Sequence, residues 1–209
     1  MPVDSATLLA FATAVLAIVV SPGPDTVLIL RYALTSGQKA GFAAVAGVQL
    51  GLILHTLLAV LGISLIIASS PLLFRSVAIA GAAYLAWLGL QAFREGGLMT
   101  LDGPRQPVSA IKACRDAILT NILNPKVIIL FLALLPNFVA VERGNVPAQL
   151  ITLSAALISI NVAWQAPMAW AANGIRRRLL RPRVQRAVSR VTGTILLTFA
   201  GLLLYEHIF

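Results

Sequence analysis

Charged residues are scarce in this 209-residue chain: they make up 11% of it, whereas apolar residues make up 59%. A soluble domain usually carries about 25% charged residues. The chain therefore has too little polar surface to coat a globule in water, and we expect it to reside in lipid. Acidic residues are the scarcest, with seven against 16 Lys and Arg. No motif of a nucleic-acid-binding fold accompanies this basic excess, so we interpret it as membrane topology and expect no nucleic-acid partner.

Reactive side chains are also few. Cys114 is the single cysteine, which excludes an intrachain disulfide and a multi-cysteine metal site. Of two histidines, His207 lies at the end of the chain, and the motifs H-E-x-x-H and G-x-S-x-G do not occur. The sequence therefore predicts no enzyme, no metal and no cofactor. Because a G-x-x-x-x-G-K-S/T loop is missing too, the chain is expected to carry no ATPase of its own.

The segment Met1–Phe11 has no Lys or Arg, so it lacks the cationic start of a signal peptide and is expected to stay in the protein. Long apolar runs dominate instead, and a spanning helix needs about 20 such residues. Six stretches qualify: Ala6–Ala33, Gly41–Ser69, Leu72–Phe93, Ala113–Val139, Pro147–Asn173 and Ala187–Ile208. We predict an all-α integral membrane protein with six transmembrane helices in a single domain, residues 1–209.

The basic residues predict the orientation of these spans. One side of the membrane receives Lys39, Arg94, Arg105, Lys112, Arg115, Arg176, Arg177, Arg178, Arg181, Arg183, Arg186 and Arg190. The other side receives Arg75 and Arg143, with Asp4, Glu142 and Glu206. Because cytoplasmic loops carry an excess of Lys and Arg, we expect both termini outside the cytoplasm. The arginine-rich segment near residues 176–190 is expected to fix this orientation among lipid headgroups rather than to select a particular lipid.

Two predicted spans contain a proline preceded by a helix-capping residue. Ser21 precedes Pro22, and Asn124 precedes Pro125, 103 positions further along the chain. Ser or Asn followed by Pro is a helix-start signal, so both spans are predicted to stop and begin again within the membrane. The breaks divide the chain into two three-helix repeats, about residues 1–95 and 113–209, joined by a cytoplasmic linker at about 96–112.

Because each repeat has three spans, the second repeat enters the membrane in the opposite orientation to the first. This is the inverted-repeat arrangement of secondary transporters, whose binding sites lie where broken helices meet. The candidate site comprises Ser21, Pro22, Gly23, Pro24, Asp25, Asn121, Asn124, Pro125 and Lys126. A charge at the bilayer centre costs about 2.5–3.5 kcal/mol, so Asp25 and Lys126 are expected to face one interior cavity. Asp25 could exchange a proton or hold a substrate ammonium, while Lys126 attracts a carboxylate. The alternative is a structural ion pair between them.

Further residues strengthen a likeness to a known family. Ser21-Pro22-Gly23-Pro24-Asp25 is followed by Gly37, Gly41, Gly47 and Gly51, and later by Asn124-Pro125-Lys126, Phe131 and Pro136-Asn137-Phe138. Together these motifs resemble the LysE family of amino-acid translocators, in particular its homoserine/threonine-efflux branch. The resemblance implies a proton-driven exporter of amino acids or close derivatives in the bacterial inner membrane, with periplasmic termini. The family more often has Asn at the position of Asp25, so the acid here could alter coupling or favour a more cationic substrate.

Polar and small residues in other spans add candidates. Gly47, Gly51 and Gly62 share one face of the second span with His55, and we predict that they allow close helix packing. Gln49 points to nearly the opposite face, so we do not expect it to share a site with His55. In the fifth span, Asn161 and Gln165 lie one turn apart and could bind a polar solute or join helices. Another small metabolite or a cation as cargo, a non-transport scaffold and a homodimer stay open as alternatives.

Overall fold

The computed structural model describes residues 2–21, 23–69, 107–172 and 181–208, with isolated positions between 72 and 93. Throughout this part of the chain the regular secondary structure is helical, as predicted. The α-helices are α1 (Ser5–Val20), α2 (Pro24–Thr35), α3 (Gln38–Ser69), α5 (Ala110–Ile122), α6 (Pro125–Ile129), α7 (Val146–Trp170) and α9 (Pro182–Ile208). A π-helical turn, η1 (Leu130–Leu134), and two 3₁₀ turns, η2 (Leu135–Phe138) and η3 (Val141–Arg143), connect α6 to α7.

The first predicted break is present, but the helix begins again later than expected. α1 and α2 meet at a bend of 55°, and Ser21 ends α1 rather than starting the next helix, since its N–H donates to the Ala17 carbonyl. Gly23 is the N-cap of α2, and Pro24 is its first residue. Pro24 suits that position because its fixed φ is helical and it has no N–H to satisfy. Pro22 lies outside the described residues.

The second break lies where the sequence predicts it. The segments Ala110–Ile122 and Lys126–Phe138 are bent by 58°. Asn124 is the N-cap of α6, its Oδ1 accepts a hydrogen bond of 3.1 Å from the Lys126 N–H, and Pro125 follows it as the first helical residue. The second half of this span then passes through η1 and η2 instead of staying α-helical.

Two unbroken helices are long and apolar enough to cross a membrane: α3 over Gln38–Gly62 and α7 over Val146–Trp170. Each bent pair can form one further span, which gives up to four candidates among the described residues. The predicted third span and the linker fall largely outside these residues. α9 contains the predicted sixth span, but the whole helix is less apolar than α3 because arginines occupy its first turns.

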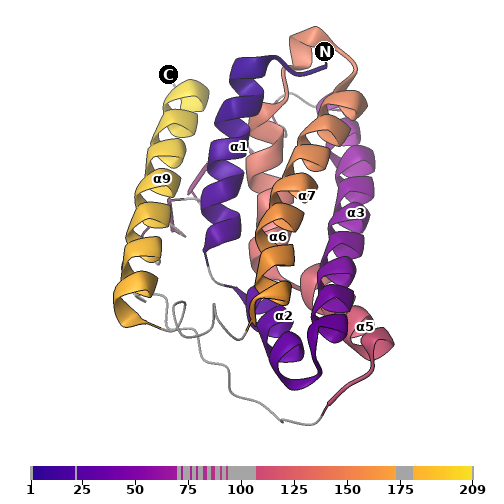
Figure 1. Cartoon of the computed structure of the whole chain (residues 1–209). Coiled ribbons are helices and arrows are strands. Elements are labelled where there is room, and N and C mark those ends of the chain that lie inside the picture. The colour runs from indigo at the N-terminus through magenta and orange to yellow at the C-terminus, as the bar shows by residue number, and fades with distance from the viewer. Residues whose placement is uncertain are drawn as a thin grey trace.

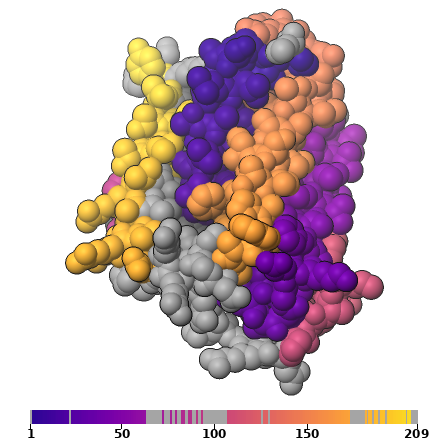
Figure 2. Space-filling view, viewed as in Figure 1, coloured from indigo at the N-terminus to yellow at the C-terminus, as the bar shows by residue number. Residues whose placement is uncertain are grey.

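Figure 1 shows how the helices run. The N-terminal end of α1 and the C-terminal end of α9 lie together at the upper end of the molecule. The α1–α2 pair descends from that end, whereas α5 through η2 rises toward it, so the two broken segments run in opposite directions. On the face drawn in Figure 2, α1 and α7 lie side by side between α9 and α3.

Large apolar side chains cover much of the outer surface. Leu57, Leu58 and Leu61 of α3 are more than half exposed, as are Leu9 of α1 and Ile151 of α7. In water this exposure would be unfavourable by about 25 cal/mol for each Å². Lipid removes that cost, so the exposed leucines fit the predicted membrane location.

Two glycines let α5 lie directly against α3. A Cβ atom built on Gly47 would lie 2.9 Å from the Ala117 Cβ and would also meet the Cys114 carbonyl oxygen. A Cβ on Gly51 would lie 2.9 Å from the Cβ and Cγ of Asn121. Gly62 is exposed, and nothing described lies within 4 Å of its Cβ position, so its packing role stays a prediction. The face of α3 that carries the three glycines therefore extends beyond the stretch that α5 covers.

Candidate functional site

A cavity lies between the two breaks. It offers about 50 Å³ of space for the centres of water molecules, which is room for a few waters at about 10–15 Å³ each. Its polar lining consists of Asp25, Thr26, Asn121, Asn124, Lys126, Asn161 and Gln165, together with Gly23. Its apolar lining consists of Ile18, Val19, Leu52, Val127, Leu130 and Leu157. Side chains from both halves of the chain therefore surround one hollow.

The structure brings most predicted site residues to this cavity. Seven of them line it: Gly23, Asp25, Asn121, Asn124, Lys126, Asn161 and Gln165. Ser21 contributes its backbone carbonyl to the same region. Pro24 and Pro125 act through the backbone, as the first residues of α2 and α6, and the Pro24 side chain is exposed.

Asp25 lies at the start of α2 with 8% of its surface exposed. Its Oδ2 accepts a hydrogen bond of 2.9 Å from Asn121 Nδ2 of α5. Its Oδ1 is buried and has no hydrogen-bond partner among the described residues. Asn121 is fully buried, and it fits there because Gly51, which lies against it, has no side chain. One carboxylate oxygen thus joins the two halves, while the other is unpaired.

Lys126 lies at the start of α6, and its side chain reaches across to the first break. Its Nζ donates a hydrogen bond of 2.7 Å to the Ser21 carbonyl. The last carbonyl groups of a helix lack intrahelical partners and carry partial negative charge, so the ammonium stabilises the carboxyl end of α1. The described ion pairs include none between Lys126 and Asp25. The ion pair considered as an alternative is therefore not formed.

Gln49 is a polar neighbour of the site that the sequence argument did not include among the site residues. Its Nε2 donates to Gln165 Oε1 at 3.0 Å, and its Oε1 accepts from Asn161 Nδ2 at 3.3 Å. Gln49 does face away from His55, but α7 packs on that face of α3 and brings its two amides there. These contacts join α3 to α7 and hold two cavity-lining side chains in place.

His55 is an interior histidine with a polar and an aromatic neighbour. Its Nε2 lies 3.4 Å from the Asn121 carbonyl, and its ring stacks on Phe131 with centroids 5.3 Å apart. Thr26 and the apolar lining were missed. Thr26 could have been found as the neighbour of Asp25, whereas the apolar residues carry no signal that distinguishes them from residues facing lipid.

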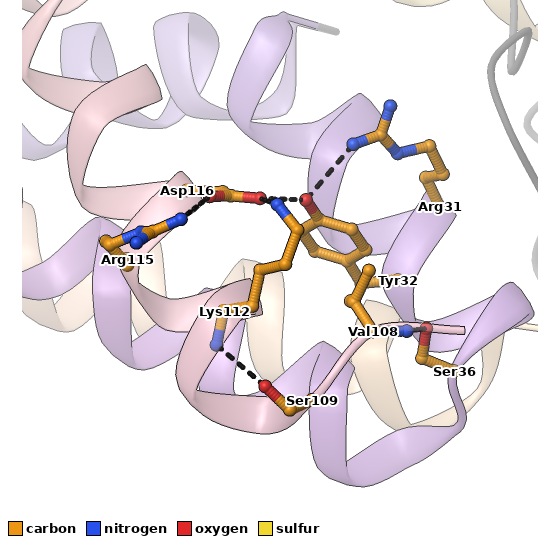
Figure 3. Close-up of polar contacts among 8 residues, drawn as sticks. All are labelled: Arg31, Tyr32, Ser36, Val108, Ser109, Lys112, Arg115 and Asp116. Atoms are coloured by element: carbon orange, nitrogen blue, oxygen red, sulfur yellow. Dashed lines mark hydrogen bonds and ion pairs between the residues drawn. The ribbon is translucent and has the colours of Figure 1, made fainter. Parts of the chain in front are cut away.

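Polar contacts join the two halves at the lower end of the molecule (Figure 3). Tyr32 of α2 donates its hydroxyl proton to Asp116 Oδ2 of α5 at 2.7 Å, and Lys112 donates to the same oxygen at 2.8 Å. The Val108 N–H also donates to Ser36 Oγ at 2.8 Å. Together these bonds keep α2 and α5 together below the cavity.

Aromatic packing joins three segments toward the upper end. Phe138 of η2 packs edge-on against Phe11 of α1, with centroids 5.2 Å apart, and at 6.0 Å against Phe199 of α9. An ion pair of 3.1 Å between Arg143 and Asp4 lies above this cluster. The contacts above the cavity thus combine aromatic packing with an ion pair, whereas the contacts named below it are polar.

The family model of the LysE type translocator matches residues 16–207. The chain belongs to the LysE family. This confirms the resemblance noted in the sequence and makes the protein a membrane transporter, not an enzyme. A non-transport scaffold, which the sequence left open, is thereby the weaker hypothesis.

Several curated relatives align over most of this LysE-family chain. The homoserine/homoserine lactone efflux protein of Salmonella typhimurium is 30% identical over 88% of each chain. The leucine efflux protein of Klebsiella pneumoniae is 26% identical over 88% of each chain. An uncharacterized membrane protein of Bacillus subtilis, YrhP, is 30% identical over 92% of this chain and 95% of its own. No solved structure matches the chain.

Proposed function

We propose that this LysE-family protein exports amino acids or close derivatives, such as homoserine, threonine or leucine, and that the cargo binds in the cavity between the breaks. The observation that carries the proposal is the cavity itself, where an acid and a lysine from opposite halves meet apolar side chains. Small-molecule sites combine such an apolar wall with a few polar groups that fix orientation. The names of two relatives, homoserine/homoserine lactone efflux protein and leucine efflux protein, support the same cargo class.

The lining suits a small solute with one polar and one apolar end. Leu52, Leu130 and Leu157 offer an apolar surface for an aliphatic side chain, and burying such a chain contributes about 0.8 kcal/mol for each CH₂ group. The amides of Asn161 and Gln165 offer hydrogen bonds to a hydroxyl group. Side-chain movement must enlarge the cavity when a whole amino acid enters.

The proposed topology has six spans in two inverted repeats, in the bacterial inner membrane with periplasmic termini. Three observations support it. The broken pairs run in opposite directions, and the outer ends of α1 and α9 lie together. Lys39, Lys112 and Arg115 belong to the first turns of α3 and α5, at the lower end, which we take as cytoplasmic.

Transport would proceed by alternating access, as in other inverted-repeat transporters. The polar contacts between Tyr32 and Asp116 would separate to admit cargo from the cytoplasm, and the aromatic cluster at Phe138 would open for release. Proton antiport is proposed as the driving reaction, with Asp25 carrying the proton when cargo is absent. The unpaired Oδ1 of Asp25 supports this role because it is free to take a proton inside the cavity.

Efflux from preloaded inside-out and right-side-out vesicles, with and without a proton gradient, tests the proposal over a panel of amino acids. The expected result is gradient-dependent export of at least one amino acid, and loss of gradient dependence in Asp25→Asn with the protein still in the membrane. Glu142→Gln makes the same acid-to-amide change at an exposed position and should transport normally. Absence of any gradient-dependent movement would favour another cargo, and unchanged coupling in Asp25→Asn would refute the proton role.

A further inference from the structure

We infer that the cavity recognises a primary ammonium group at Asp25 and does not require a free carboxylate on its cargo. The inference rests on the proposed function and names the chemical class of the cargo more narrowly: primary amines, whether amino acids or their amides, esters and lactones. Hydroxy acids and oxo acids, which keep the carboxylate but lack the amine, fall outside this class.

The unpaired oxygen of Asp25 points to a cationic ligand. Asp25 Oδ1 is buried and without a partner in the described structure, although the residue lines the cavity. A buried acceptor without a partner is unfavourable, and more so when it is charged. A primary ammonium offers three N–H donors and a positive charge, so one bound group would satisfy both the hydrogen bond and the charge.

Asn121 positions this carboxylate. Its Nδ2 donates to Asp25 Oδ2 at 2.9 Å, which fixes the carboxyl group but adds no positive charge. Gly51 allows Asn121 to reach that place, since any side chain at position 51 would collide with it. The hydrogen-bond donor to Asp25 is therefore neutral. Lys126 attracts the carboxylate electrostatically but donates no hydrogen bond to it, so Oδ1 is left as an acceptor for a cation in the cavity.

The cationic group that would bind a carboxylate, Lys126, already donates to another acceptor. Lys126 Nζ donates to the Ser21 carbonyl at 2.7 Å and lies beside Gly23, whose Cβ position is 3.7 Å away. Its hydrogen bond is therefore made to the carboxyl end of α1, while its charge also attracts Asp25. The Lys126 N–H, at the start of α6, is taken by Asn124 Oδ1. The cavity thus combines a free anionic acceptor with a cation that already has a partner.

The cargoes in the relatives' names have this chemistry in common. Homoserine, homoserine lactone and leucine all carry a primary amine, and the lactone has no free carboxylate. Because this chain has an acid at position 25, we expect it to accept cationic amines such as amino amides and amino lactones at least as readily as zwitterions.

A binding assay separates this inference from the proposed function. The purified full-length protein is heated in detergent with leucine, leucinamide or 2-hydroxyisocaproate, which share one carbon skeleton, near pH 6.5 so that the amines are protonated. We expect leucinamide to stabilise the protein at concentrations within about threefold of leucine. The hydroxy acid should need at least tenfold more, a difference of about 1.4 kcal/mol in binding. Homoserine and its lactone form a second matched pair.

Variants of the protein identify which residues recognise the ammonium group. Asp25→Asn should abolish the preference for leucine over 2-hydroxyisocaproate, whereas Glu142→Gln, an exposed acid outside the cavity, should keep it. Lys126→Met should leave the leucine-to-leucinamide ratio unchanged within about twofold. A selective loss of leucine binding in Lys126→Met would show that Lys126 binds the carboxylate and would overturn the inference.

Each outcome of these assays decides one of the two claims. Tight binding of the hydroxy acid, or failure of leucinamide to bind, overturns the ammonium inference even if amino acids are exported. Amine-selective binding without export in vesicles supports the inference and refutes the proposed function. If none of the five compounds stabilises the protein, the inference fails.

Discussion

Gly51→Ala is expected to disturb the site without replacing any polar residue, because the new Cβ would collide with the Asn121 side chain. The new Cβ would lie 2.9 Å from the Asn121 Cβ and Cγ, well inside the usual 3.5–4.0 Å separation of carbon atoms. Overpacking of this kind costs about 1–3 kcal/mol. If Asn121 also loses its bond to Asp25, a further contribution of about 1.5–3 kcal/mol disappears, because that acceptor is charged. The better helix propensity of Ala offsets about 1 kcal/mol.

With the bond to Asp25 lost, the net loss is about 3 kcal/mol, equivalent to a fall in melting temperature of about 6–12 °C for a chain of this size. Thermal unfolding of detergent-purified protein measures it, and leucine-dependent stabilisation should weaken in the same variant. Gly62→Ala is the matched control on α3: nothing described lies near its Cβ position, so only the propensity gain applies. If Gly51→Ala melts as high as Gly62→Ala and binds leucine normally, the account of Asn121 is wrong.

Three further changes test other parts of the structure. Tyr32→Phe removes the hydroxyl that donates to Asp116 and should lower unfolding stability by about 1–2 kcal/mol, measured by thermal unfolding; a melting curve like that of the parent would contradict the contact. Gln149→Leu removes three buried hydrogen bonds that hold the loop before α7 and should cost about 2–4 kcal/mol, whereas Thr152→Val, whose hydroxyl bonds only within α7, should stay within about 0.5 kcal/mol of the parent. The bond from the Thr7 N–H holds the pKa of Asp4 below its usual value. Asp4 therefore stabilises the fold above the unfolded-state pKa of about 3.9, and this contribution is lost as pH falls through the folded-state pKa. The difference in melting temperature between the parent and Asp4→Asn should accordingly shrink as pH falls below about 4, and a constant difference would refute the role of the charge.

The sequence by itself determined the features that depend on composition and local chain geometry. Its shortage of charge placed the protein in a membrane, and Asn124 followed by Pro125 marked the second break, because capping and the fixed φ of proline act within a few residues. The same local rule was misleading at the first break. Pro22 and Pro24 are both possible first residues of a helix, and the structure begins α2 at Pro24. The cost of burying charge also identified Asp25 and Lys126 as cavity residues before any contact was known.

Only the tertiary structure decided which faces meet. Helical periodicity orders the side chains around one helix, but it does not state which neighbour packs on which face. The contacts of Gln49 with Asn161 and Gln165 are therefore visible only in the folded chain, where α7 packs on that face of α3. Gly51 and Gly62 look alike in the sequence, yet only Gly51 lies against α5. Lys126 extends to the Ser21 carbonyl, 105 residues away in the chain, because the free carbonyls at the end of α1 attract a cation only once the two breaks are side by side.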